Sequence, residues 1–172
     1  MRIIAGSRKG HRIAAPRGLT TRPTSDRVRE SAFNLIGPVD GAEVLDLFAG
    51  SGALGLEALS RGARAATFVE ADRESCRTIA ANLTRLRLEA RVLCQDVLHA
   101  VAHDRRAYDL VLCDPPYDFE SAALLPRLAG LLSERGVLVW ERAGAAPAPS
   151  VPGLRERTSR RYGSARLTLF EK

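Results

Sequence analysis

The chain has 172 residues, of which 45% are hydrophobic, 27% charged and 5% aromatic, and its formal net charge is +6. This length and composition predict one globular domain with a hydrophobic core, and they exclude a disordered tail, a fibrous repeat and a two-domain enzyme. No apolar run approaches the roughly 20 residues that a membrane-spanning helix needs, so we expect no membrane partner.

The net charge is divided unevenly along the chain. Residues 1–36 sum to +6, residues 37–152 to −4 and residues 153–172 to +4. We therefore predict a single domain over residues 1–172, in which a basic extension (1–36) precedes the core (37–172). The two basic ends favour a polyanionic partner such as nucleic acid.

The amino terminus and the cysteines indicate the cellular compartment in which the protein is expected. The first residues contain no apolar stretch of signal-peptide length, which predicts a cytoplasmic protein. Cys76, Cys94 and Cys113 lie far apart in the sequence and have no histidine nearby. We expect three reduced thiols, with neither a disulfide nor a metal site.

The first elements in chain order lie in the basic extension. Residues 2–4 and 12–14 predict a small β-ribbon around Lys9 and Gly10. Thr24 or Ser25 is then expected to cap a helix that ends at Ile36 and has one apolar face.

Short apolar runs and helical patterns alternate through the core. The predicted strands cover residues 44–48, 67–70, 91–94, 109–113 and 137–140, and the predicted helices cover residues 51–60, 73–86, 97–103 and 120–132. Residues 154–160 and 166–170 flank Tyr162 and Gly163 and predict a closing antiparallel hairpin. Continuous apolar strands that alternate with helices are typical of a parallel sheet covered on both faces, so the predicted fold is α/β, doubly wound and mostly parallel.

A glycine-rich turn follows the first predicted strand. Gly50, Gly52 and Gly55 match the pattern G-x-G-x-x-G, which lets a ligand approach backbone amides where a helix begins. Glu70 ends the next predicted strand, where a carboxylate can bind both hydroxyls of a ribose. The turn indicates a nucleoside cofactor, but three glycines do not distinguish a dinucleotide from S-adenosylmethionine.

Two aspartates near this turn have two interpretations each. Asp46 lies inside the first strand, where it could face the ammonium group of a methionine moiety, whereas it would repel a pyrophosphate. Alternatively, it is a buried aspartate held by backbone amides. Asp96 follows the third strand, where it could meet the amine of an adenine, cap the next helix, or do both.

The fourth predicted strand ends in Asp114, Pro115, Pro116 and Tyr117, the candidate catalytic residues. The two prolines remove two amide donors and leave the Pro115 carbonyl without an obvious partner. This carbonyl and a side-chain oxygen of Asp114 form a pair of acceptors that suits the exocyclic amine of a purine, and Tyr117 offers a ring for stacking. With the methyl of a sulfonium as electrophile, catalysis would be mainly positioning. The alternative is a proline-terminated strand with an exposed tyrosine.

These segments together resemble a known family. The stretch VLDLFAGSG (44–52), Glu70, Asp96 and DPPY (114–117) are similar to the motif series of S-adenosylmethionine-dependent amino-methyltransferases. With residues 6–10, 22–34 and 46–63, the chain resembles the RsmD-type bacterial 16S ribosomal RNA guanine-N2 methyltransferases over nearly its whole length. The resemblance implies a seven-stranded Rossmann-like class I methyltransferase sheet, S-adenosylmethionine as cofactor, and methylation of a guanosine N2 in the small ribosomal subunit.

The resemblance also assigns candidate site residues. The expected cofactor-binding residues are Asp46, Phe48, Gly50, Ser51, Gly52, Glu70, Asp96, Arg22 and Thr24, the last two at the methionine end. The expected RNA-binding residues are Arg8, Lys9, Arg12, Arg27 and Arg29, whose alternative is a solvated basic surface. Arg155, Arg157, Arg160 and Arg161 are candidates for the same role, or they keep the edge of the hairpin from pairing with other chains.

Three other functions stay open at this point, and we expect a monomer without a metal. An adenine-N6 methyltransferase would use the same DPPY chemistry, although no stretch is long enough for a DNA-reading domain. A nicotinamide oxidoreductase would explain the glycines and Glu70 but not Asp46 or DPPY. A non-catalytic ribosome-binding module would need only the basic ends.

Overall fold

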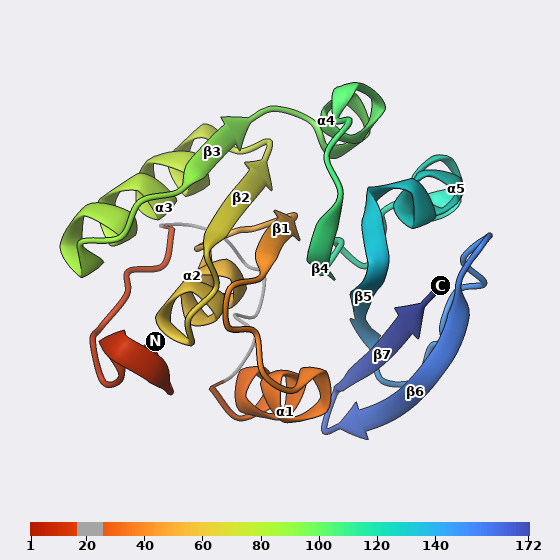
Figure 1. The fold of residues 1–172 in the computed structure, drawn as a ribbon, viewed down its shortest axis with the longest axis horizontal. Coiled ribbons are helices and arrows are strands. Elements are labelled where there is room, and N and C mark those ends of the chain that lie inside the picture. Colours follow the sequence, from red (N-terminus) through yellow and green to blue (C-terminus); the bar gives the residue numbers. More distant parts are fainter. Residues whose placement is uncertain (17–25) are drawn as a thin grey trace.

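The structure, a computed structural model, describes residues 1–16 and 26–172 and is built around one seven-stranded sheet (Figure 1). The strand order is β3-β2-β1-β4-β5-β7-β6. The strands are β1 (Glu43–Leu47), β2 (Ala65–Glu70), β3 (Arg91–Cys94), β4 (Tyr108–Cys113), β5 (Leu132–Ala143), β6 (Arg155–Tyr162) and β7 (Ala165–Glu171). β1 to β5 are parallel, and β7 pairs antiparallel with both β5 and β6. The predicted α/β fold with its antiparallel hairpin is confirmed.

Helices cover both faces of this sheet. The helices are α1 (Asp26–Ile36), α2 (Ala53–Ser60), α3 (Arg73–Leu86), α4 (Val97–His103) and α5 (Leu125–Leu128), with 3-10 turns η1 (Gly6–Arg8), η2 (Ser121–Ala123) and η3 (Ala129–Leu131). One apolar cluster packs α1, α2 and α3 on one face, and a second packs α4 and α5 on the other. Within the described ranges, no helix is long and apolar enough to cross a membrane.

One predicted helix is wrong. Residues 120–132 form two 3-10 turns and the single α-helical turn α5, and the chain enters β5 already at Leu132. Pro126 lacks an amide hydrogen and so permits the helix only at its first turn, while Gly130 has a low helix propensity. The remaining predicted strands and helices of the core agree with the structure, apart from small shifts at their ends and the longer β5.

The predicted amino-terminal ribbon is present as one antiparallel bridge, between Arg2 and Arg12. Ile3 and Ile13 are buried in the core, so the ribbon is packed on the domain. The backbone amides of Ile4 and Ala5 donate hydrogen bonds to the buried carboxylate of Glu57 in α2, at 2.8 and 3.0 Å. The predicted caps of α1, Thr24 and Ser25, lie outside the described residues.

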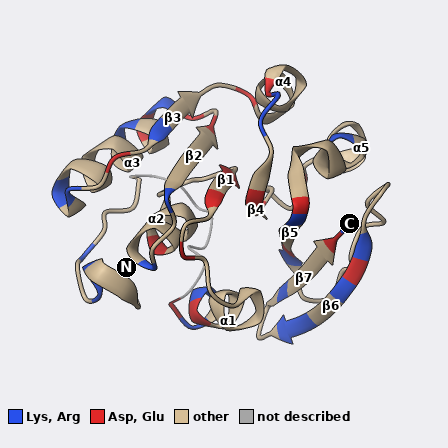
Figure 2. Cartoon of the chain, in the orientation of Figure 1, with Lys and Arg blue, Asp and Glu red and all other residues tan. Residues whose placement is uncertain are grey.

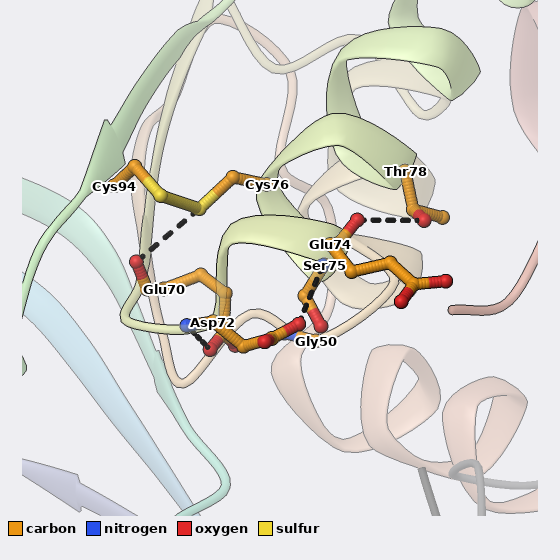
Figure 3. The surroundings of a disulfide bond; sticks show 8 residues. All are labelled: Gly50, Glu70, Asp72, Glu74, Ser75, Cys76, Thr78 and Cys94. Atoms are coloured by element: carbon orange, nitrogen blue, oxygen red, sulfur yellow. Dashed lines mark hydrogen bonds between the residues drawn. A yellow bond between two sulfur atoms is a disulfide. The ribbon is translucent and has the colours of Figure 1, made fainter. Parts of the chain in front are cut away.

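The expectation of three free thiols is wrong. A disulfide joins Cys76 to Cys94, whose Cα atoms are 5.9 Å apart, within the range that a disulfide spans (Figure 3). Cys94 pairs with Glu70 across β2 and β3, and Cys76 lies in the first turn of α3, which begins just after β2. The fold therefore brings together two cysteines that are 18 residues apart. Cys113 is free and buried.

Candidate functional site

A cleft of about 570 Å³ opens at the carboxyl ends of β1, β2 and β4, a volume typical of small-ligand sites. The described residues that line it are Met1, Ala15, Pro16, Asp46, Phe48, Ala49, Gly50, Ser51, Ala53, Leu54, Glu70, Asp72, Ser75, Asp114, Pro115, Pro116, Tyr117, Asp118 and Glu141. The glycine turn and the DPPY corner, which lie far apart in the sequence, thus face one cavity.

The described lining of this cleft is strongly acidic. It contains six acidic side chains, from Asp46, Glu70, Asp72, Asp114, Asp118 and Glu141, and no lysine or arginine from the described ranges. Like charges raise the free energy of an anion in such a cleft, whereas a cation is attracted. The cleft therefore suits a cationic ligand and disfavours a pyrophosphate.

The turn between β1 and α2 has an unusual backbone. Phe48 has a positive φ of 60°, rare for a residue with a side chain, and Gly52 has a φ of 78° where α2 begins. A Cβ on Gly52 would lie 3.2 Å from Ile79 and 3.3 Å from Phe68, so there is little room for a side chain. The sharp turn places Gly50 and Ser51 against the cleft.

Glu70 is held by this turn. Its Oε2 accepts a hydrogen bond from the Gly50 amide at 2.8 Å, and its Oε1 accepts one from the Asp72 amide at 2.9 Å (Figure 3). Each carboxylate oxygen has a second lone pair, so Glu70 can still accept two hydroxyl groups. The structure thus fixes the orientation of the carboxylate that was expected at the ribose.

Asp46 lies inside β1, is 2% exposed, and borders the cleft. Its Oδ2 accepts a hydrogen bond from the amide of Gly55 at 2.9 Å. Burial raises its pKa to about 8; the Gly55 hydrogen bond opposes this shift, and the negative charges of Asp114 and Glu70 add to it. The interpretation as a buried aspartate held by a backbone amide is therefore confirmed, and Asp46 also borders the cleft.

Asp96 has the capping position that was its second interpretation. It is the N-cap of α4, where its Oδ1 accepts a hydrogen bond from the His99 amide at 3.1 Å. Asp96 and Gly52 do not belong to the described lining of the cleft. Asp72 has the same capping role for α3, and it does line the cleft.

The DPPY corner forms the mouth of the cleft. Pro115 is buried, whereas Tyr117 is 73% exposed, the only large hydrophobic side chain so exposed among the described residues. The rings of Phe48 and Phe119 pack edge to face, with their centroids 4.8 Å apart. This contact joins the glycine turn to the segment that follows the DPPY corner. Among the described residues, no hydrogen bond to the Pro115 carbonyl is found, while the neighbouring Pro116 carbonyl accepts one from Phe119.

The expected RNA-binding residues have different environments. Lys9, Arg12 and Arg27 are exposed. Arg8 is half-buried, and its guanidinium donates to the carbonyls of Leu86 and Arg87 at the end of α3, at 2.6 and 3.3 Å.

The expectation for Arg29 is contradicted. Its side chain is 0% exposed; it pairs with Asp26 at 2.9 Å and lies 3.7 Å from the buried Glu57. The apolar face of α1 packs on the core, where the buried Glu57 attracts the guanidinium of Arg29. The side chain therefore points inward and cannot contact RNA. Two expected cofactor-binding residues, Arg22 and Thr24, lie outside the described residues.

The sequence did not indicate every residue of the cleft. Ala15 and Pro16 border it because the amino-terminal ribbon packs against α2 and α3, a long-range contact without a local pattern. The position of Glu141 at the cleft could have been predicted from the sequence. It directly follows the fifth predicted strand, and the carboxyl ends of parallel strands lie at the same edge of the sheet. Asp118 directly follows the DPPY corner.

Comparisons with known proteins identify the relatives of this chain. A family model described as Conserved hypothetical protein 95 matches residues 1–171. The chain is 40% identical to the Bacillus subtilis (strain 168) protein named "Putative rRNA methyltransferase YlbH", over 100% of the chain and 99% of that protein. It is 41% identical to the Ribosomal RNA small subunit methyltransferase D of Escherichia coli (strain K12), over 82% of the chain and 71% of that protein.

A solved structure has the same architecture. The Escherichia coli protein named "Putative methyltransferase yhhF" superposes with a TM-score of 0.90 at 35% sequence identity, covering 100% of this chain and 97% of the other. The similarity therefore extends over the sheet, the hairpin and the cleft together.

Proposed function

The chain belongs to the family described as Conserved hypothetical protein 95, and we propose that it transfers a methyl group from S-adenosylmethionine to the exocyclic N2 of a guanosine in 16S ribosomal RNA. The main support for this proposal is that the glycine turn and the DPPY corner face the same cavity. The acidic cleft suits a cationic cofactor, and the DPPY corner at its mouth suits an amine.

The described residues of the cleft fit S-adenosylmethionine, which supplies an electrophilic methyl group when bound. Glu70, fixed by the Gly50 amide, would accept the ribose hydroxyls. Asp46, near the carboxyl end of β1, would face the methionine ammonium. The six acidic side chains of the described lining argue against the dinucleotide alternative, since they would repel a pyrophosphate.

The DPPY corner positions the target amine. The Pro115 carbonyl and the carboxylate of Asp114 would accept the two hydrogens of the amine, which directs its lone pair toward the cleft. Tyr117, exposed at the mouth, would stack on the base. When the amine nitrogen takes the methyl group, the bond from sulfur to that methyl would break and the cofactor would leave as a neutral thioether. The methylated nitrogen would then be acidic, and the Asp114 carboxylate would accept the proton that leaves. Catalysis then rests on positioning and on preformed acceptors.

The substrate is a base of the small ribosomal subunit. Lys9, Arg12 and Arg27, which are exposed, remain the candidates for phosphate contacts from the amino-terminal side. Arg29 is excluded from that set because its side chain is fully buried. Arg8 is half-buried and already donates hydrogen bonds to carbonyls at the end of α3, which leaves it a weaker candidate. We further propose that the protein acts as a monomer in the cytoplasm, where ribosomal subunits are assembled.

The experiment uses S-adenosylmethionine labelled in its methyl group and small ribosomal subunits that lack modifications. Incubation with the purified protein should label the RNA, and nuclease digestion followed by mass spectrometry should identify N2-methylguanosine. N6-methyladenosine would instead support the adenine alternative. Subunits that bind but acquire no label would support the non-catalytic module.

A further inference from the structure

The strand register aligns three arginines from three separate segments. Arg142 in β5 is the direct partner of Arg166 in β7, and Arg166 is the direct partner of Arg161 in β6. Direct partners on neighbouring strands project to the same face of a sheet. Arg142, Arg166 and Arg161, which we call the arginine row, therefore form a continuous line across β5, β7 and β6.

The arginine row begins at the mouth of the cleft. Arg142 lines a small cavity together with Pro115, Pro116 and Tyr117 of the DPPY corner. The preceding residue, Glu141, projects to the opposite face of the sheet and lines the main cleft, so β5 borders both cavities. The row thus extends from the place where the target base would stack toward the outer strand β6, where arginines occupy much of the ribbon (Figure 2).

The arginine row lacks the carboxylate partners that other arginines have. Arg29, Arg61 and Arg106 each form an ion pair, whereas no ion pair is found for Arg142, Arg161 or Arg166 within the described residues. The ion pair of the hairpin itself, between Arg155 and Glu171, lies at its other end. Like charges directly opposite each other on neighbouring strands destabilise a sheet, so this arrangement has a cost in the free protein.

The hydrogen bonds of the arginine row leave donors available. Arg166 donates to the Ser159 hydroxyl and the Gly144 carbonyl over 3.3 and 3.4 Å, and its buried Nε has no partner. Arg161 uses its Nε for the Gly163 carbonyl at 3.0 Å. Arg142 makes no hydrogen bond to the part of the chain that the structure describes. Each guanidinium has five N–H donors, so, apart from the buried Nε of Arg166, most donors in the row are free to bind an anion.

We propose that the arginine row binds the phosphates of the RNA strand that flanks the target base, an inference that rests on the proposed function. Guanidinium groups match the geometry of phosphate oxygens, and three of them in a line fit a polyanion better than a single small anion. A bound phosphodiester strand also relieves the repulsion between the three arginines. With Lys9, Arg12 and Arg27 on the amino-terminal side, the RNA would be held on both sides of the cleft.

The test compares charge-neutralising variants with a matched control. Arg142→Gln and Arg161→Gln, singly and together, remove positive charge from the row. Arg135→Gln removes the same charge from an exposed position of β5 outside the row, at a residue with no expected RNA contact. The readouts are binding of unmodified small subunits over a range of salt concentrations, the KM for those subunits, and the Kd for S-adenosylmethionine by calorimetry.

We expect the double variant to bind small subunits at least about tenfold more weakly, since hydrogen bonds to charged groups are the stronger kind. The slope of log K against log salt should become less negative by about 0.7 to 0.9 for each arginine removed. The Kd for S-adenosylmethionine should not change, and Arg135→Gln should behave as the wild type.

Two outcomes overturn the proposal. Unchanged subunit binding in the double variant would show that the row does not contact RNA, and an equal loss in Arg135→Gln would show an effect of overall charge. The proposed function has its own test, because it fails if the wild type does not methylate the RNA. The binding comparison does not depend on methylation, so the two failures can be distinguished.

Discussion

The carboxylate of Asp46 in β1 accepts a hydrogen bond from the backbone amide of Gly55 in α2, with Oδ2 and N 2.9 Å apart. The contact is possible because Gly55 has no side chain, since a Cβ there would lie 3.0 Å from Oδ2 and 2.4 Å from the ring of Phe68. Strand and helix are therefore closely packed around a buried acid, and this acid borders the cleft.

Cofactor affinity should depend on the ionisation of Asp46. Its pKa is raised to about 8 by burial, so the acid is largely neutral at pH 6, and a bound cation favours the carboxylate. We expect the Kd for S-adenosylmethionine to fall by up to about tenfold per pH unit between pH 6 and 8 and then to level off. Calorimetry in buffers of different ionisation enthalpy should detect release of a proton. In Asp46→Asn the release from this group should vanish; the same release in that variant would contradict the prediction.

Asp46 should also make folding stability depend on pH. The folded pKa of about 8 lies above the ordinary value of 3.8, so between these values the folded chain retains a proton that the unfolded chain has lost. The contribution of Asp46 to the free energy of unfolding therefore falls as pH rises through this range. Asp46→Asn should become progressively more stable relative to wild type from pH 5 to 8 in urea titrations. A constant difference would mean that Asp46 titrates normally.

Asp114 and Tyr117 should act on methyl transfer more than on cofactor binding. Asp114→Ala removes a preformed acceptor, which we expect to lower kcat by about a hundredfold or more. Tyr117→Ala removes the exposed ring, whereas Tyr117→Phe keeps it and should retain most activity. Both alanine variants should still bind S-adenosylmethionine in calorimetry. Retained activity in both of them would refute the proposed role of the DPPY corner.

Arg29 should be essential for stability. Arg29→Ala leaves the buried Glu57 with one fewer cationic neighbour. Breaking such a buried pair lowers the free energy of unfolding by about 3 kcal/mol. Arg27→Ala, on the exposed side of the same helix, is the matched control and should change stability by less than about 0.5 kcal/mol. Chemical denaturation measures both. Equal stability of the two variants would show that the Arg29 contacts contribute little.

The Cys76–Cys94 disulfide can be tested by alkylation. In the unfolded, unreduced chain only Cys113 should react, and after reduction all three cysteines should react, as counted by mass spectrometry. A crosslink that closes a loop of this length stabilises a protein by about 3 kcal/mol, so Cys94→Ser should unfold at a lower denaturant concentration. Alkylation of three cysteines without reductant would show that the bond does not form.

The local sequence was sufficient for the framework of this protein. Alternating apolar strands and helices, the three glycines at 50, 52 and 55, and the DPPY corner each depend on neighbours in the chain. They predicted the α/β sheet, and they led us to expect the nucleoside site and the amine site at its edge. The helix predicted over residues 120–132 failed because Pro126 and Gly130 weaken it and because β5 extends back to Leu132.

Tertiary packing decided the features that join distant segments. The sequence predicted that Arg29, like Arg27, is exposed. Only the packing of α1 over the buried Glu57 directs the Arg29 side chain inward. Cys76 and Cys94 meet because β3 lies next to β2, and Arg142, Arg166 and Arg161 align because of the hairpin register. Sequence patterns report periodicity and local propensity, whereas these contacts depend on which strands are neighbours and on how they are aligned.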